Sequence, residues 1–260
     1  MNPLSKTIEA RPLLEICIDS VESALASQNG GAERVELCAN LLEGGTTPSL
    51  GTILRVREQI SIQLQVIIRP RGGDFHYSAD EFEVMQKDIA AAKQAGADGV
   101  VLGLLLTDGS VDKERTRRLV EAAHPMNVTF HRAFDMLRDP LQALEDVIET
   151  GANRILTSGG EASAMQGAST IAALVRQAQG RITILAGGGI RAHNALDIIR
   201  QTAVREIHVG FKDPVPSLME YRNPRISMGT ATDREYQRIV VLEEKVRSLK
   251  AVLLGTESSV

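Results

Sequence analysis

The stretch Gly151-Ala152-Asn153-Arg154-Ile155 decides the fold, because close versions of it recur along the chain. Gly31-Ala32-Glu33-Arg34-Val35 and Gly96-Ala97-Asp98-Gly99-Val100 share its pattern, and 202–207 is a version without the glycine. In the three versions with glycine, the glycine ends a helix in the left-handed conformation and an apolar strand then begins. Helix-to-strand junctions that recur in this way indicate alternating strands and helices, and hence a parallel sheet.

Eight short apolar stretches are predicted to be strands, with amphipathic stretches between them. The strands are expected at 13–18, 34–38, 64–69, 99–104, 127–132, 154–157, 182–186 and 206–209. Eight βα units in a chain of 260 residues is the size of a TIM (β/α)8 barrel. The alternative, an open doubly wound sheet, usually carries a G-x-G-x-x-G turn after its first strand. Asp19-Ser20-Val21 stands there instead, so the α/β barrel is favoured.

Local signals place three of the helices. In 81–95, one helical face carries Phe82, Met85, Ile89 and Ala92. Asp139 before Pro140 predicts a helix start, and we expect this helix to turn inward Leu141, Leu144, Val147 and Ile148. A last helix is expected over 233–253, after an irregular stretch at 211–229. The chain is thus predicted to be one barrel domain over 13–254, with an N-terminal extension at 1–12 and a tail at 255–260.

Composition and charge exclude several classes of function. The formal net charge is −4 and no lysine- or arginine-rich run occurs, which argues against a nucleic-acid partner. Two cysteines do not make a disulfide framework in a chain of this length. Residues 1–12 are polar, and no apolar run approaches the length of a membrane span. We expect a soluble, cytoplasmic protein without a membrane partner.

Charged side chains are predicted to face the barrel axis. Because alternate residues of a strand point the same way, the inward set is Leu13, Glu15, Cys17, Glu36, Cys38, Gln65, Ile67, Arg69, Thr129, His131, Glu206 and His208. Barrel interiors are normally filled with bulky apolar side chains, and buried charges persist only beside a ligand or in a tight network. The pattern therefore indicates either a ligand site or a polar core that satisfies itself.

The segment Ile67-Ile68-Arg69-Pro70-Arg71-Gly72-Gly73-Asp74-Phe75 suggests an anion site. Two guanidiniums stand at the mouth of the third strand, where a carboxylate or phosphate can be gripped. We expect Arg69 to face inward, and Arg71 and Asp74 to lie in a loop beside the ligand. The other interpretation is an arginine–carboxylate pair that only holds the loop.

Strand ends further along the chain add candidate groups. His131, Arg132 and Asp135 follow the fifth strand, and histidine beside a carboxylate is a common general acid or base. The turns at Ser158-Gly159 and around Gly188 expose backbone N–H groups to an anion, or are merely tight turns.

These groups give an enzyme hypothesis. Arg69 and Arg71 would clamp a small phosphorylated or carboxylated metabolite, helped by the amides around Ser158 and Gly188. His131 or Glu36 would move a proton, while Asp135 or Glu15 orients its neighbour.

The cysteines give a second hypothesis. Cys17 and Cys38 occupy equivalent points on neighbouring strands, so their thiols can approach one another inside the barrel. Soft thiolates suit Cu(I), and histidine can add to such a site. His208, inward on the eighth strand, is a candidate ligand-binding residue. Buried free cysteine is also ordinary core filling.

A third hypothesis is a scaffold without catalysis. Its working surface would be the last helix, with Tyr236, Ile239, Val240, Val246 and Leu249 at helical spacing. The same stripe would equally well pack against its own barrel.

The chain resembles the CutC family, also called copper homeostasis proteins. The motifs that carry the resemblance are Leu14-Glu15-Ile16-Cys17, Arg34-Val35-Glu36-Leu37-Cys38, 43–49, 68–75, Thr129-Phe130-His131-Arg132-Ala133-Phe134-Asp135 and Leu156-Thr157-Ser158-Gly159, within 13–228. The resemblance implies a cytoplasmic TIM barrel that self-associates as a dimer or tetramer. It also implies a role in copper handling, with Cu(I) on the cysteines that match Cys17 and Cys38. It implies no particular reaction.

Overall fold

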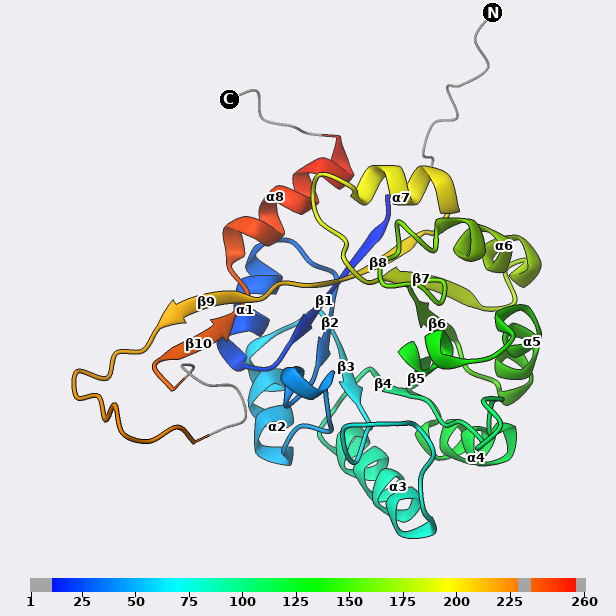
Figure 1. The fold of residues 1–260 in the computed structure, drawn as a ribbon, viewed down its shortest axis with the longest axis horizontal. Helices are drawn as coiled ribbons and strands as arrows, with labels where there is room; N and C mark the ends of the chain where they lie inside the picture. The colour runs from blue at the N-terminus through cyan, green and yellow to red at the C-terminus, as the bar shows by residue number, and fades with distance from the viewer. Residues whose placement is uncertain (1–10, 229–234, 256–260) are drawn as a thin grey trace, which may run out of the picture.

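The computed structural model describes residues 11–228 and 235–255, and its centre is a closed barrel of eight parallel strands. The strands follow one another around the barrel in chain order, and β8 pairs with β1 to close it. Figure 1 shows the helices arranged as an outer ring around these strands. The predicted TIM barrel is therefore confirmed. The strands are β1 (Leu13–Ile18), β2 (Arg34–Leu37), β3 (Gln63–Ile67), β4 (Gly99–Leu102), β5 (Asn127–Phe130), β6 (Arg154–Thr157), β7 (Thr183–Gly187) and β8 (Glu206–Gly210).

The recurring junctions join the helices to these strands as the sequence predicts. Gly31, Gly96 and Gly151 have φ values of 93°, 80° and 86°, and each precedes a strand by a few residues. In the version without glycine, Ala203 adopts φ 60° at the same point before β8. The helices are α1 (Val21–Asn29), α2 (Leu50–Gln59), α3 (Ala79–Gln94), α4 (Lys113–Ala123), α5 (Pro140–Thr150), α6 (Ala168–Ala178), α7 (Ala195–Thr202) and α8 (Glu243–Leu254), with 3-10 turns η1 (Leu41–Glu43) and η2 (Arg132–Met136).

The helix faces agree with prediction except at one position. The four apolar residues chosen in α3 are all buried. Asp139 caps α5 by accepting hydrogen bonds from the backbone N–H groups of Leu141 and Gln142, and Pro140 takes the first helical position. Leu141 itself is 42 % exposed, so its inward placement is wrong. The buried face of α5 is centred on Ala143, Val147 and Thr150, which leaves Leu141 at its edge.

The prediction of one long helix at the C-terminal end is wrong. Gln237–Val240 is a strand, β10, which pairs antiparallel with β9 (Asp213–Pro216). Ile239 and Val240 are β-branched and suit a strand, and the helix starts only at Glu243. Val246 and Leu249 are buried on α8, as the self-packing interpretation requires. Residue 233, the expected helix start, lies outside the described residues. In Figure 1 the β9–β10 hairpin extends away from the barrel.

The apolar core lies between the strands and the helices. Val35 and Leu37 of β2 are fully buried there, as the strand parity predicts. No described helix is long and apolar enough to cross a membrane.

Candidate functional site

Buried ion pairs cross the barrel interior near the start of the strands. Arg34, which is 0 % exposed, is paired with Glu15 of β1 and, at 2.5 Å, with Glu206 of β8. Arg154 of β6 lies 2.7 Å from the same Glu206 and donates to the Thr129 hydroxyl at 3.0 Å. These charges satisfy one another. The lower interior is therefore a polar core that satisfies itself, which is one of the two interpretations of the inward charges.

The two arginines of this network were missed by the sequence analysis. Arg34 has the same strand parity as Glu36 and Cys38, so the parity of the second strand places it inward as well. No inward set was predicted for the sixth strand, so parity gave no sign of Arg154. Three inward carboxylates are nevertheless a signal for buried cations, because charges inside a barrel need partners.

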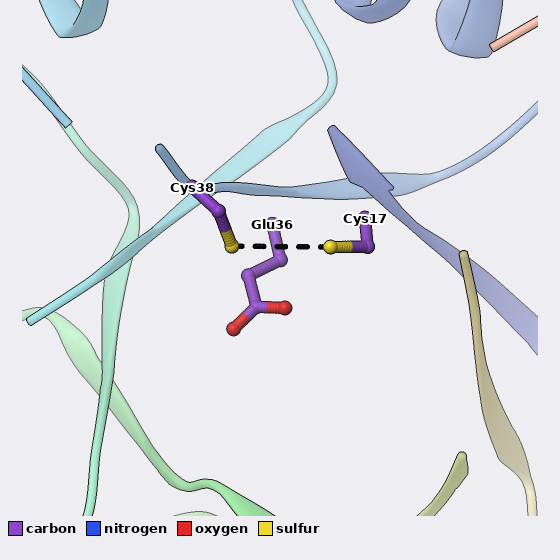
Figure 2. Close-up of side chains that lie close together, drawn as sticks. All are labelled: Cys17, Glu36 and Cys38. Atoms are coloured by element: carbon purple, nitrogen blue, oxygen red, sulfur yellow. Dashed lines mark hydrogen bonds between the residues drawn. The ribbon is translucent and has the colours of Figure 1, made fainter. Parts of the chain in front are cut away.

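Above the network, two thiols and a carboxylate come together. Cys17 Sγ and Cys38 Sγ are 3.8 Å apart, and these atoms lie with a Glu36 carboxylate oxygen within 4.8 Å of one another. In Figure 2 the two sulfur atoms face each other, and Glu36 passes between them with its carboxylate beyond the line that joins them. Cys17 lies opposite Glu36 in the β1–β2 register, and Cys38 directly follows β2. Within the described residues, this is the only such group of three or more possible metal ligands.

His208 of β8 lies beside this group. Its Nδ1 is 2.7 Å from the Glu15 carboxylate, and its Nε2 is 3.7 Å from Glu36 Oε2. It lies opposite Glu15 in the β1–β8 register, two residues before Cys17 along β1. His208 therefore connects the ion-pair network below to the cysteines above.

The electrostatics give neighbouring groups opposite protonation states. Burial opposes ionisation of Glu15, but the Arg34 charge and the hydrogen bond from His208 outweigh it and lower its pKa to about 2. The hydrogen bond with Cys38, helped by His208 against the effect of burial, lowers the pKa of Cys17 to about 5. Burial opposes protonation of His208, yet its hydrogen bonds to Cys17 and Glu15 hold its pKa well above the ordinary value. Cys17 and His208 are thus a thiolate and an imidazolium.

The other two groups of the cluster stay protonated. Burial, and then the charge of Cys17, raise the pKa of Glu36 to about 8. The hydrogen bond to Cys17, followed by burial, raises the pKa of the Cys38 thiol well above its ordinary value. A cation entering the cluster would therefore meet one thiolate and displace protons from its neighbours.

The two arginines after β3 are engaged by the protein itself. Arg69 is buried, as expected, but its guanidinium donates to the backbone carbonyls of Glu43, Gly45 and Gly73 at 2.7–2.8 Å. Arg71 lies in the loop and pairs with Glu81 at 2.6 Å and with Asp74 at 3.1 Å. Arg71 and Asp74 thus match the interpretation as a pair that holds the loop.

The expected pairing of His131 with Asp135 is not formed. Arg132 and Asp135 are three residues apart in η2, which puts both on one side of the 3-10 turn, 2.6 Å from each other. The Asp135 carboxylate also accepts from the backbone N–H groups of Ser158 and Gly160. The glycine turn after β6 does bind an anion, and that anion is the protein's own Asp135.

The remaining parts of the predicted anion site lie close to this carboxylate. Arg132 donates to the Ser158 hydroxyl at 2.8 Å, and Gly159 N–H donates to Thr157 Oγ1. Gly188, at φ 101°, would place a Cβ 3.1 Å from Ser158 Cβ and 3.8 Å from Arg132 Cζ. The turns after β6 and β7 therefore meet around the Arg132–Asp135 pair.

His131 occupies a separate buried position. Its Nδ1 accepts a hydrogen bond from the backbone N–H of Ala133, so its Nε2 carries the proton. That Nε2 is buried without a partner among the described residues. Burial, and then the charge of Arg69, lower the pKa of His131 to about 3, so the ring is neutral.

The family of the chain follows from comparison with known proteins. The model of the CutC family matches residues 12–213. The chain belongs to the CutC family. A CutC family protein of Chromobacterium violaceum is 49% identical over 241 residues, which are 93% of this chain and 98% of the relative. The human copper homeostasis protein cutC homolog is 46% identical over 241 residues, covering 92% and 88% of the two chains.

A solved CutC structure agrees with the fold described above. The CutC crystal structure from Streptococcus agalactiae has a TM-score of 0.72 at 35% identity, and the match covers 76% of this chain and 98% of that one. Two relatives, from Mus musculus and Homo sapiens, carry the name copper homeostasis protein cutC homolog. The sequence resemblance to CutC proteins is thereby confirmed.

Proposed function

We propose that the protein takes part in copper homeostasis in the cytoplasm by binding Cu(I) at Cys17 and Cys38. The observation that carries the proposal is the 3.8 Å separation of the two sulfur atoms inside the barrel. Sulfur ligands select Cu(I) over the harder divalent cations, and Cys17 already supplies a thiolate. Glu36, within 4.8 Å of both sulfurs, supplies an oxygen at the edge of the same group.

Anaerobic Cu(I) titration against a chromogenic Cu(I) chelator tests this proposal. We expect the wild type to retain one Cu(I) per chain and a Cys17→Ala/Cys38→Ala variant to retain none. Ile67→Val is the matched control, because Ile67 packs against Cys38 in the same small apolar cluster but offers no ligand atom. Equal Cu(I) retention by the wild type and the double variant would refute the proposal.

A small anionic ligand at the barrel mouth is a second candidate function. Most donors of the predicted clamp are occupied by Glu81, Asp74 and Asp135, as described above. Two buried N–H donors have no partner in the described structure, His131 Nε2 and Arg69 Nε. A buried donor without an acceptor costs about 1–3 kcal/mol, so an acceptor from a ligand would be favourable there. The Phe75 ring, 4.9 Å from the His131 ring and 5.0 Å from Arg69 Cζ, contacts both.

Native mass spectrometry of the purified protein tests the second candidate. We expect a co-purified small molecule on the wild type that is lost in His131→Phe, which removes the donor and keeps an aromatic ring. Arg71→Ala is the control and should keep the adduct, because that guanidinium is paired within its loop. An adduct that persists in His131→Phe, or no adduct on the wild type after screening with small carboxylates and phosphates, would count against this site.

A further inference from the structure

We propose that His208, held in place by Glu15, is a further protein ligand of the metal at Cys17 and Cys38. The inference rests on the proposed metal binding and adds what it leaves open, the number and kind of ligands. The site would then hold its metal with two sulfurs and one imidazole nitrogen, and with Glu36 close enough to complete the set.

The two cysteines supply only two ligand atoms. Their sulfur atoms, 3.8 Å apart in the metal-free protein, come from β1 and from the residue that follows β2. Imidazole suits copper as well as thiolate does, so a neighbouring histidine can add a third ligand.

His208 is placed and oriented to add this ligand. Histidines that bind metals usually bond through one ring nitrogen and give the N–H of the other to a carboxylate. His208 shows this arrangement, with Nδ1 2.7 Å from Glu15 and Nε2 on the side of Glu36, at 3.7 Å. His208 lies opposite Glu15 in the β1–β8 register, and Glu15 precedes Cys17 by two residues on the same face of β1.

The support for His208 continues behind Glu15. Glu15 is 2 % exposed and is paired on its other side with the fully buried Arg34. Arg34 is bound in turn to Glu206 of β8, the strand that carries His208. Glu15 is thus fixed at both ends, and the imidazole has little freedom to turn away. We therefore assign His208 as a ligand and Glu15 as a positioning residue.

X-ray absorption and chelator competition on the Cu(I)-loaded full-length protein test this assignment. We expect the wild-type spectrum to contain sulfur scatterers and the outer-shell pattern of an imidazole. In His208→Ala that pattern should disappear and the affinity for Cu(I) should fall. Glu15→Gln should keep the imidazole signal but lower the affinity by about 10- to 100-fold, the usual effect of removing a partner of a metal ligand.

Two further arms separate the possible causes. Added imidazole should restore the nitrogen signal and the affinity of His208→Ala, a rescue that a folding defect would not show. His193→Gln, at an exposed histidine, is the matched control and should behave as the wild type. A wild-type spectrum with sulfur alone, or unchanged affinity in His208→Ala, would overturn the assignment while leaving the cysteines in place. Retention of copper by Cys17→Ala/Cys38→Ala would instead refute the proposed function itself.

Discussion

Glu15 and Glu36 show how one residue type takes two states within a single barrel. Glu15 lies beside Arg34, whose charge overcomes the effect of burial and keeps the carboxylate ionised. Glu36 lies higher in the barrel beside the Cys17 thiolate, where burial and a like charge favour the protonated acid. The two carboxyl groups therefore contribute to stability with opposite dependence on pH.

We predict that Glu36→Gln stabilises the metal-free protein at neutral pH. The folded-state pKa of about 8 lies above the ordinary value of 4.5, so the unfolded chain releases this proton more readily. Stability associated with Glu36 is complete below pH 4.5 and is lost as the pH rises toward 8. The glutamine variant should gain roughly 1–3 kcal/mol at pH 7 and almost nothing near pH 4, by urea unfolding.

Glu15→Gln is the matched comparison and should have the opposite effect. The folded-state pKa of Glu15, about 2, lies below 4.5, so its contribution is present above pH 4.5 and is lost as the pH falls toward 2. The variant should therefore be destabilised at pH 7. A Glu36→Gln variant that is destabilised at pH 7 would show that Glu36 is ionised in the folded protein.

At the scale of elements, the sequence predicts best where local signals and packing agree. The bounds of β1 and β6 are as predicted, and the capping of α5 by Asp139 is confirmed. The β9–β10 hairpin was missed, because spacing at 236–240 fits both a helix and a strand and only pairing with β9 decides between them. Asp135 was assigned to the wrong partner because the short turn η2 is set by contacts with β6, which a single sequence does not display.

The close approach of α8 to α1 depends on a glycine. A Cβ at Gly30, just after α1, would lie 2.5 Å from Val246 Cβ and 3.0 Å from the Glu243 carbonyl oxygen. We predict that Gly30→Ala costs about 1–3 kcal/mol of unfolding free energy, because α8 must move outward. Gly51→Ala is the control, since its Cβ meets nothing closer than 4.0 Å within α2, and it should be neutral or slightly stabilising. Equal stability of the two variants in urea would contradict this account.

At the scale of the whole molecule, exposed apolar side chains recur along 217–228, the described part of the connection between β9 and β10. Leu218, Tyr221 and Met228 are 93 %, 72 % and 84 % exposed. Exposed apolar patches commonly mark interaction sites. This connection belongs to the hairpin that Figure 1 shows extending from the barrel. We therefore propose residues 217–228 as a contact surface for a second copy of the chain.

We predict that the protein is a dimer or tetramer in solution and that this connection contributes to the contact. Leu218→Ser/Met228→Ser should lower the mass measured by sedimentation equilibrium. Met136→Ser is the control, because Met136 is 68 % exposed at η2, away from the hairpin, and its loss should leave the mass unchanged. A monomeric wild type would refute the prediction.

Because β8 pairs with β1 to close the barrel, the proposed metal ligands come from strands that are synthesised at very different times. Glu15 and His208, which bond to each other, are 193 positions apart, whereas Cys17 and Cys38 are only 21 apart. A nascent chain leaving the ribosome would thus present both thiols long before the imidazole exists. Copper that arrives early would find sulfur alone, and the full donor set would form only when the last strand joins the first. Tight retention of the ion would then be a sign that synthesis and folding are complete.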